Sequence, residues 1–171
     1  MNILIFIKRF DMKHVSLKSI ENAIDLVDNL DDQELEKLSE KYALAQQVLL
    51  SYVMTAPEEY ENENLEGLLI YYFCLLSECF EQEEIKVNTI TEEQIDAFEE
   101  PYFEMLDNYF ENDEQEILEG FCDQPELAQF MAMEISTEDE DGSMLDDETA
   151  TQLFIVTIAM ISLMNQSIVN N

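Results

Sequence analysis

Residues 137–148 come nearest to a metal-binding motif in this sequence. They match a calcium-binding EF-hand loop at Asp139, at Asp141, at the turn glycine Gly142 and at Glu148. Thr137 occupies the first position, where such a loop needs a carboxylate, and no second loop of this kind is present although such loops usually work in pairs. We therefore expect a solvated acidic linker here and no calcium site of micromolar affinity.

Other catalytic and cofactor motifs lack their necessary residues. His14 is the one histidine, which leaves no second histidine for a Ser-His-Asp or Cys-His arrangement, and no glutamate precedes it at the spacing of a di-metal site. Gly67, Gly120 and Gly142 are too far apart to form a phosphate-binding loop. The sequence therefore predicts no enzyme and no bound cofactor, with His14 at the surface near the N-terminus.

The most informative set of side chains is expected on a helix over residues 91–111. At 100° per residue, five carboxylates fall on one side of this helix in a row about 22 Å long, which we call the acidic ridge. The ridge consists of Asp96, Glu100, Glu104, Asp107 and Glu111. The opposite side is expected to hold Phe98, Tyr102, Met105, Leu106, Tyr109 and Phe110.

Two interpretations of the acidic ridge remain open. It is either a solvated face that maintains solubility, or a surface that meets a cationic partner. The nearby aromatic side chains also allow two interpretations, because aromatic residues at helical spacing either pack in a core or line a ligand pocket. They are Tyr102, Phe103, Tyr109 and Phe110.

The charge balance narrows the range of partners. The chain has 40 acidic and 7 basic residues and a formal net charge of −33. After Tyr42, Lys86 is the one basic residue among 31 acidic ones. Nucleic acids and anionic membranes would be repelled, so we expect no direct nucleic-acid binding and no membrane binding. A basic protein partner, cations or water must face these carboxylates.

Length and composition indicate a folded, all-α protein. The chain has 171 residues, enough for one domain with its own core, and its 47% hydrophobic content is too high for a disordered chain. Three glycines and three prolines supply few of the turns that a many-stranded sheet would need. We expect an irregular bundle of five to seven helices in a single domain.

The start of the helical domain and the cellular location of the protein can be inferred from the N-terminal residues and the cysteines. Residues 1–11 are either an extension that pairs with the body or a misassigned start, with Met12 as the natural first residue and residues 12–171 as the helical domain. The basic pair follows the apolar stretch of residues 1–10, unlike a secretory signal. Three cysteines without a CxxC pair suggest neither a disulfide framework nor a zinc site, so we expect a cytoplasmic protein.

Capping residues and apolar periodicity place the individual helices. Pro101 should kink or divide the fourth, and Pro125 should start the sixth. The third and last helices are apolar nearly all round, and we place them at the centre. The expected helices cover residues 16–30, 31–55, 65–82, 91–111, 113–121, 125–135 and 146–169.

Residues 153–164 form an apolar run that could be a buried core helix or a membrane anchor. The run is shorter than the ~20 apolar residues that a membrane span requires, and no basic residue flanks it. A core helix is therefore the preferred interpretation.

Three functional hypotheses follow. The first is a non-enzymatic binding protein, such as an inhibitor or immunity-type protein, whose acidic ridge docks on a basic partner. The second is a structural or assembly subunit in which the third or last helix forms a homo-oligomer interface and the acidity serves solubility alone. Adaptation to high salt is a third account of the composition, without particular support in the sequence.

Overall fold

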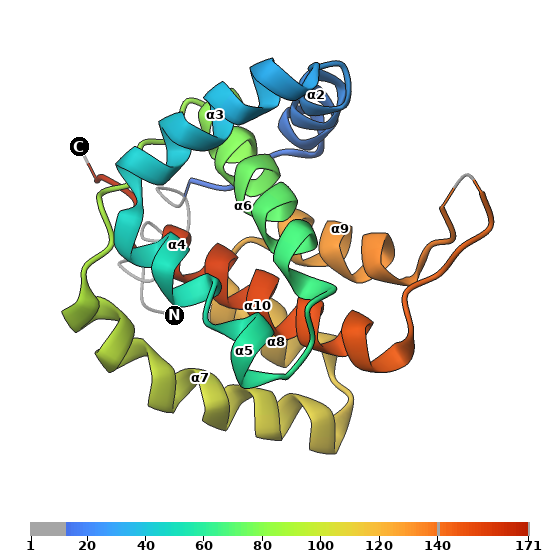
Figure 1. Ribbon diagram of the computed structural model, residues 1–171. Coiled ribbons are helices and arrows are strands. Elements are labelled where there is room, and N and C mark those ends of the chain that lie inside the picture. The colour runs from blue at the N-terminus through green and yellow to red at the C-terminus, as the bar shows by residue number, and fades with distance from the viewer. Residues whose placement is uncertain (1–12, 140, 171) are drawn as a thin grey trace.

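The computed structural model describes residues 13–139 and 141–170, and all regular secondary structure in these residues is helical (Figure 1). The all-α prediction is therefore confirmed. An isolated antiparallel bridge joins Val87 to Ile168. The helices are α2 (Leu17–Asp28), α3 (Asp32–Ala45), α4 (Gln47–Val53), α5 (Ala56–Glu59), α6 (Leu65–Gln82), α7 (Glu92–Asn112), α8 (Gln115–Cys122), α9 (Pro125–Ser136) and α10 (Asp147–Gln166).

The predicted caps begin four of these helices. Ser16 caps α2, and Asp146 caps α10 by accepting a hydrogen bond from the Thr149 amide at 2.8 Å. Helices α3 and α7 each begin with a full capping box, in which the cap side chain and the third helical side chain satisfy one another's backbone amides. Local sequence is sufficient to set these starts because each cap bonds within its own first turn.

The second predicted helix, residues 31–55, is divided at Gln46, and a further short helix, α5, precedes α6. The bundle consequently contains more than the five to seven helices expected. Gln46 leaves the helical conformation and is buried, and its side-chain amide donates to the Asn88 carbonyl and accepts from the Ile90 backbone amide, each at 2.9 Å. The break therefore depends on tertiary contacts with residues 42 and 44 positions away, which helix periodicity does not reveal.

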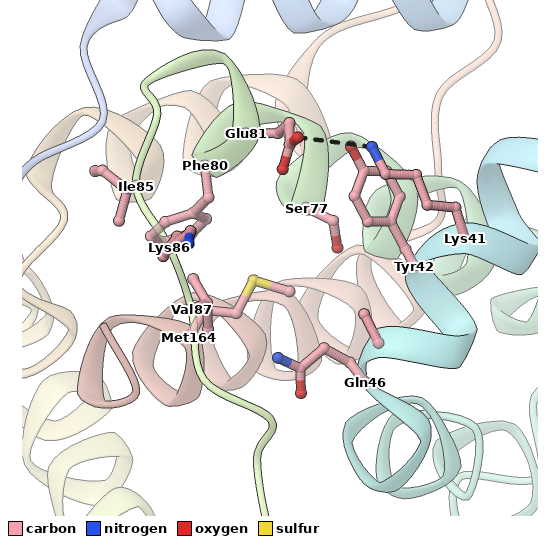
Figure 2. A pocket seen from close by; sticks show the side chains of 11 residues that line it. Lys41, Tyr42, Gln46, Ser77, Phe80, Glu81, Ile85, Lys86, Val87 and Met164 are labelled. Carbon is pink, nitrogen blue, oxygen red and sulfur yellow. Dashed lines mark ion pairs between the residues drawn. The ribbon is translucent and has the colours of Figure 1, made fainter. Parts of the chain in front are cut away.

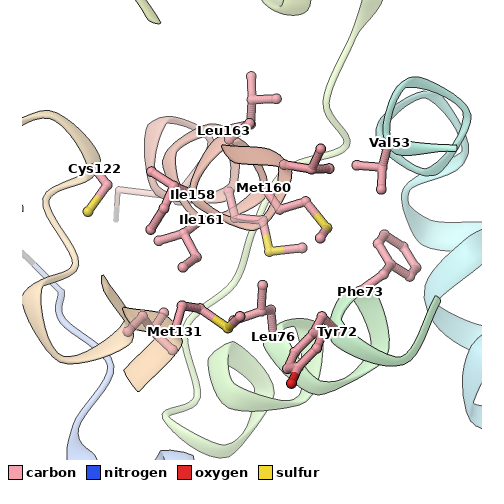
Figure 3. Close-up of a cluster of buried hydrophobic side chains, with 14 of the residues drawn as sticks. Val53, Tyr72, Phe73, Leu76, Cys122, Met131, Ile158, Met160, Ile161 and Leu163 are labelled. Carbon is pink, nitrogen blue, oxygen red and sulfur yellow. The ribbon is translucent and has the colours of Figure 1, made fainter. Parts of the chain in front are cut away.

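Helices α6 and α10 form the centre of the fold, as predicted. They pack against each other, α2 and α3 cover α6, and α8 and α9 cover α10. Figure 3 shows Phe73 and Leu76 of α6 facing Met160 and Ile161 of α10, with Met131 of α9 beside them. One cluster of buried side chains runs through all of these helices, so a single core holds the bundle together.

The buried side chain of Gln124 links residues near the two ends of the described chain. Gln124 precedes α9, and its side-chain carbonyl oxygen accepts a hydrogen bond from the Val15 backbone amide at 2.8 Å. Its amide nitrogen donates to the Lys13 carbonyl at 2.8 Å and to the Asn165 side chain at 2.9 Å. A side chain with both donor and acceptor atoms can satisfy these groups together, which explains why a polar residue is tolerated here without exposure.

Helix α10 is long and apolar enough to cross a membrane by length and composition, and 72% of its most apolar window is buried inside the fold. Its polar Thr157 and Ser162 are also buried, and each donates a hydrogen bond to the carbonyl one turn earlier in the helix. This degree of burial is typical of the core helix of a globular protein. The cysteines, Cys74, Cys79 and Cys122, are buried free thiols.

Candidate partner-binding surface

All five side chains of the acidic ridge are exposed to solvent along α7. The opposite side of the helix packs inward through Ile95, Phe98, Tyr102, Met105 and Leu106. Pro101 does not divide α7, which runs without interruption to Asn112. Both Pro101 and Ala97, whose carbonyl loses its helical donor to the proline ring, lie on the exposed side, where water can satisfy that carbonyl.

Tyr102 is one of the side chains that fix α7 to the core. The Tyr102 hydroxyl donates to the Ile155 carbonyl in α10, and its ring stacks on Phe98 with centroids 4.8 Å apart. Phe121 of α8 packs against both rings. Burial raises the pKa of Tyr102 well above its ordinary value, because the charged phenolate would be desolvated there. The ridge is thus carried by a helix with a rigid aromatic base.

One residue that the sequence predicts on the inner face of α7, Phe110, does not lie there. Phe110 was expected opposite the ridge, but 53% of its surface is exposed. At 100° per residue it lies about 80° from the middle of the ridge, on the flank of the helix between the ridge and the inner face. Phe103, 49% exposed, also borders the ridge. Of the four aromatic residues considered for a pocket, Tyr102 is buried and Tyr109 packs near Phe154 at a centroid distance of 6.3 Å.

An open groove of about 500 Å³ runs between α4 and α7 beside the ridge. Its α4 wall includes Val48 and Tyr52, and its α7 wall is acidic, with Asp96 belonging to both the groove and the ridge. The lining residues are Gln47, Val48, Ser51, Tyr52, Thr55, Glu92, Ile95, Asp96 and Glu99. The groove and the ridge share Asp96 and therefore form one continuous anionic surface, with the apolar side chains of Val48 and Ile95 among the groove lining.

A cavity of about 60 Å³ adjoins this groove and shares Tyr52 with it. Tyr60, Tyr102 and Phe103 also line the cavity. Burial, with the nearby Glu99 and Glu59 carboxylates adding to it, raises the pKa of Tyr52 to about 12. Of the four aromatic residues considered for a ligand pocket, Tyr102 and Phe103 line this cavity. Its volume is small for a ligand.

No ion pair neutralises the ridge within residues 13–139 and 141–170. The ion pairs found there join His14 to Asp123 at 3.2 Å and Lys41 to Glu81 at 3.7 Å, both away from α7. Helix α7 also has no basic residue in its last turn. His14 is exposed, as predicted for this position.

The linker with EF-hand resemblance folds around Ser143. The Ser143 hydroxyl donates to Asp141 at 2.6 Å, the Ser143 carbonyl accepts from the Asp139 amide at 2.8 Å, and Gly142 adopts a left-handed φ of 80°. Among the described residues, which exclude residue 140 of this linker, no three His, Cys, Asp or Glu side chains are grouped to hold a metal ion. The absence of a calcium site stays a prediction.

Comparisons with known proteins found no matching family model, no similar curated protein and no similar solved structure. The sequence identified the five ridge carboxylates but not the α4 wall of the groove, because that wall comes from residues more than 40 positions earlier in the chain. Nothing local to residues 47–55 indicated which helix would face them.

Proposed function

We propose that the protein is a non-enzymatic binding protein that docks on a basic protein partner through the acidic ridge and the adjoining α4–α7 groove. The observation that carries the proposal is that the five ridge carboxylates, Asp96, Glu100, Glu104, Asp107 and Glu111, are all exposed and make no ion pair in the described part of the chain. A partner with a row of lysine or arginine side chains would supply the missing charge.

The arrangement of the ridge opposes the stability of its own helix, which favours a role beyond structure. Neighbouring carboxylates three or four residues apart repel each other by about 0.2–0.5 kcal/mol per pair. Glu111 also lies in the last turn of α7, where the helix dipole disfavours negative charge. A face selected for solubility alone could mix lysines with the acids and avoid both effects.

Phe103 and Phe110 add an apolar component to the surface. Both rings border the ridge and are about half exposed, so each can cover the aliphatic stem of a lysine or arginine or interact with its charged group. A combination of exposed aromatic rings and unpaired charge is more typical of a protein interface than of a surface that only contacts water.

The alternative, an assembly subunit with an oligomer interface on α6 or α10, has less support. The interface was expected on the broad apolar surfaces of these helices, and both are already buried within the bundle. Ile70 is the one large hydrophobic residue of α6 that is exposed, with 40% of its surface accessible to solvent. Little apolar surface thus remains on either helix for a second copy of the chain.

The test is a pull-down from the native host at low and high salt, followed by a binding titration of each captured protein. The ridge variant changes Asp96 and Asp107 to Asn, and Glu100, Glu104 and Glu111 to Gln. We expect it to weaken binding at low salt, and we expect added salt to weaken wild-type binding, because both remove or screen the charges that attract the partner.

A matched control separates the ridge from the total charge of the protein. The control variant neutralises five exposed carboxylates elsewhere, on α2, α3 and the 137–146 linker, and has the same net charge as the ridge variant. Its positions are Glu21, Asp25, Glu36, Glu40 and Glu138. The proposal requires the control to bind nearly as wild type does. Equal loss in both variants, or wild-type affinity that does not respond to salt, would refute it and favour the assembly subunit.

A further inference from the structure

A second pocket, of about 200 Å³, opens between the C-terminal end of α3, α6 and residues 85–87 (Figure 2). Lys41 and Lys86 are both among its lining residues and stand on different sides of it in Figure 2. The other lining residues are Tyr42, Ala45, Gln46, Ser77, Phe80, Glu81, Ile85, Val87 and Met164. In a chain with 7 basic residues and 40 acidic ones, two lysines at one pocket are a strong local departure from the general charge.

The interior of this pocket is effectively apolar. Ala45, Phe80, Ile85, Val87 and Met164 supply hydrocarbon and sulfur surface. The polar lining groups have partners within the protein. Gln46 bonds the backbone at Asn88 and Ile90, the Ser77 hydroxyl donates to the Phe73 carbonyl at 2.7 Å, and the Tyr42 hydroxyl donates to the buried Glu78 carboxylate. An apolar group entering the pocket would therefore displace no internal hydrogen bond.

The wall formed by residues 85–90 is held in place from both sides. The Lys86 carbonyl accepts from the Val169 amide at 2.9 Å, and the Asn88 amide donates to the Ser167 carbonyl at 2.7 Å. On the other side, Gln46 holds Asn88 and Ile90. The pocket is thus formed before any ligand arrives, which lowers the ordering entropy that binding must overcome.

The two lysines differ in their pairing. The Lys41 ammonium lies 3.7 Å from the Glu81 carboxylate, which offsets its charge. The Lys86 side chain is exposed and makes no ion pair or hydrogen bond within residues 13–139 and 141–170. With Glu81 as the one acidic lining residue, the pocket lining carries a net single positive charge. This charge is opposite in sign to that of the protein as a whole.

We infer that the pocket between Lys41 and Lys86 binds a small molecule with an apolar body and a single negative charge, such as a short-chain carboxylate. The body occupies the surface formed by Phe80, Val87 and Met164, and the carboxylate meets the Lys86 ammonium at the opening. The size is appropriate, because a dry apolar cavity of about 150 Å³ in another protein holds benzene. This inference is independent of the acidic ridge and of any protein partner.

Three probes of equal chain length test the inference on the full-length protein: hexanoate, 1-hexanol and hexylammonium. The net charge of the protein favours hexylammonium and disfavours hexanoate, whereas the pocket lysines predict the reverse order. Binding is followed by NMR of ¹³C-methyl methionine. The Met164 methyl lines the pocket, and the exposed Met133 and Met144 methyls serve as internal controls for non-specific binding. We expect saturable shifts at Met164, with hexanoate binding most tightly and hexylammonium least.

Single substitutions locate the charge. Lys86→Gln should weaken hexanoate binding about two- to five-fold, the range for a solvent-exposed ion pair, and leave 1-hexanol unchanged. Lys18→Gln removes an equal charge from the exposed side of α2 and should change neither. Ala45→Leu places a larger side chain at a lining position on a helix that tolerates leucine, and should weaken both ligands.

The inference is overturned if hexylammonium or 1-hexanol binds at Met164 as tightly as hexanoate does. It is equally overturned if the Met164 methyl does not shift with hexanoate, or if Lys18→Gln weakens hexanoate as much as Lys86→Gln. The thermal midpoint of each variant, measured without ligand, shows whether it is folded. Should Ala45→Leu unfold the protein, the Lys86→Gln and Lys18→Gln pair still decides the result.

Discussion

Helices α7 and α10 have nearly the same length, 21 and 20 residues, and opposite relations to solvent. Helix α10 is buried on almost every side from Gln152 to Met164, with Ile155 as the one partly exposed residue in that stretch. Helix α7 is buried along one face and presents on the other two half-exposed phenylalanines and five carboxylates that make no ion pair among residues 13–139 and 141–170. The two helices meet where the Tyr102 hydroxyl bonds the Ile155 carbonyl.

The difference separates the part of the molecule that maintains the fold from the part that is free to recognise a partner. A substitution in α10 must be accommodated by close-packed neighbours from α6, α8 and α9. A substitution on the ridge disturbs no core contact, and its effect on stability is limited to the repulsion between neighbouring ridge charges. We therefore expect stability to respond strongly to α10 and binding to respond to α7, and the following experiments test this division in order of decreasing effect on stability.

The largest effect is expected from Ile158→Ala in α10. Ile158 is fully buried, and truncating a buried isoleucine lowers the free energy of unfolding by about 2–5 kcal/mol through lost burial and the cavity left behind. Thr151→Ala, on the exposed side of the same helix, is the control and should change stability by less than about 0.5 kcal/mol. Urea unfolding measures both. Similar losses in the two variants would show that α10 is not packed as described.

The ridge variant should raise stability. The ridge contains four like-charge pairs at three- or four-residue spacing, namely 96–100, 100–104, 104–107 and 107–111. Neutralising them should increase the free energy of unfolding by about 1–2 kcal/mol at low salt, because each repulsion is worth roughly 0.2–0.5 kcal/mol. The gain should shrink at high salt, where the charges are screened. A loss of stability on neutralisation would mean that the carboxylates make favourable contacts, and would remove the contrast with α10.

Tyr102→Phe removes the hydrogen bond between the two helices. We expect the free energy of unfolding to fall by about 0.5–1.5 kcal/mol at neutral pH, since the Ile155 carbonyl already bonds within α10 and loses only its second partner. The stability of wild type should also fall above pH ~10, the pKa of an unfolded tyrosine. The sign follows from the raised pKa of Tyr102: the folded state keeps its proton there while the unfolded chain releases it.

The predicted loss of stability at alkaline pH does not come from Tyr102 alone. Tyr42, Tyr71 and Tyr72 also have raised pKa values, each chiefly through burial, so Tyr102→Phe should reduce the alkaline loss of stability without abolishing it. Denaturation curves at pH 7 and pH 11 for both proteins give the comparison. An identical pH dependence in wild type and variant would indicate that the Tyr102 hydroxyl is accessible to solvent when folded.

The smallest effect on stability is expected from Phe110→Ser. Because the Phe110 ring is 53% exposed, its loss should change the free energy of unfolding by less than about 0.5 kcal/mol. If the ring contacts the partner of the ridge, binding should weaken all the same. Isothermal titration of the captured partner, together with thermal midpoints, separates the two quantities. A large drop in the thermal midpoint would instead show that the Phe110 ring is buried in the core, as the sequence predicts.

Local patterns in the sequence determined most of the secondary structure. Ser16, Asp31, Thr91 and Asp146 marked helix starts because each cap satisfies backbone amides within its own first turn. The long apolar stretches identified α6 and α10 as central, since a helix without a polar face can only be stable when it is surrounded. The five ridge positions were predicted from helical geometry alone, and the exposed side of α7 matches them.

Only the tertiary structure decided the features that depend on distant residues. The break at Gln46 satisfies the backbone at Asn88 and Ile90, and Gln124 joins Lys13 to Asn165. The α4 wall of the groove and the meeting of Lys41 with Lys86 likewise bring together residues about 45 positions apart. A local pattern specifies which side of a helix avoids water, but which helix covers that side is set by how all the apolar surfaces are buried together.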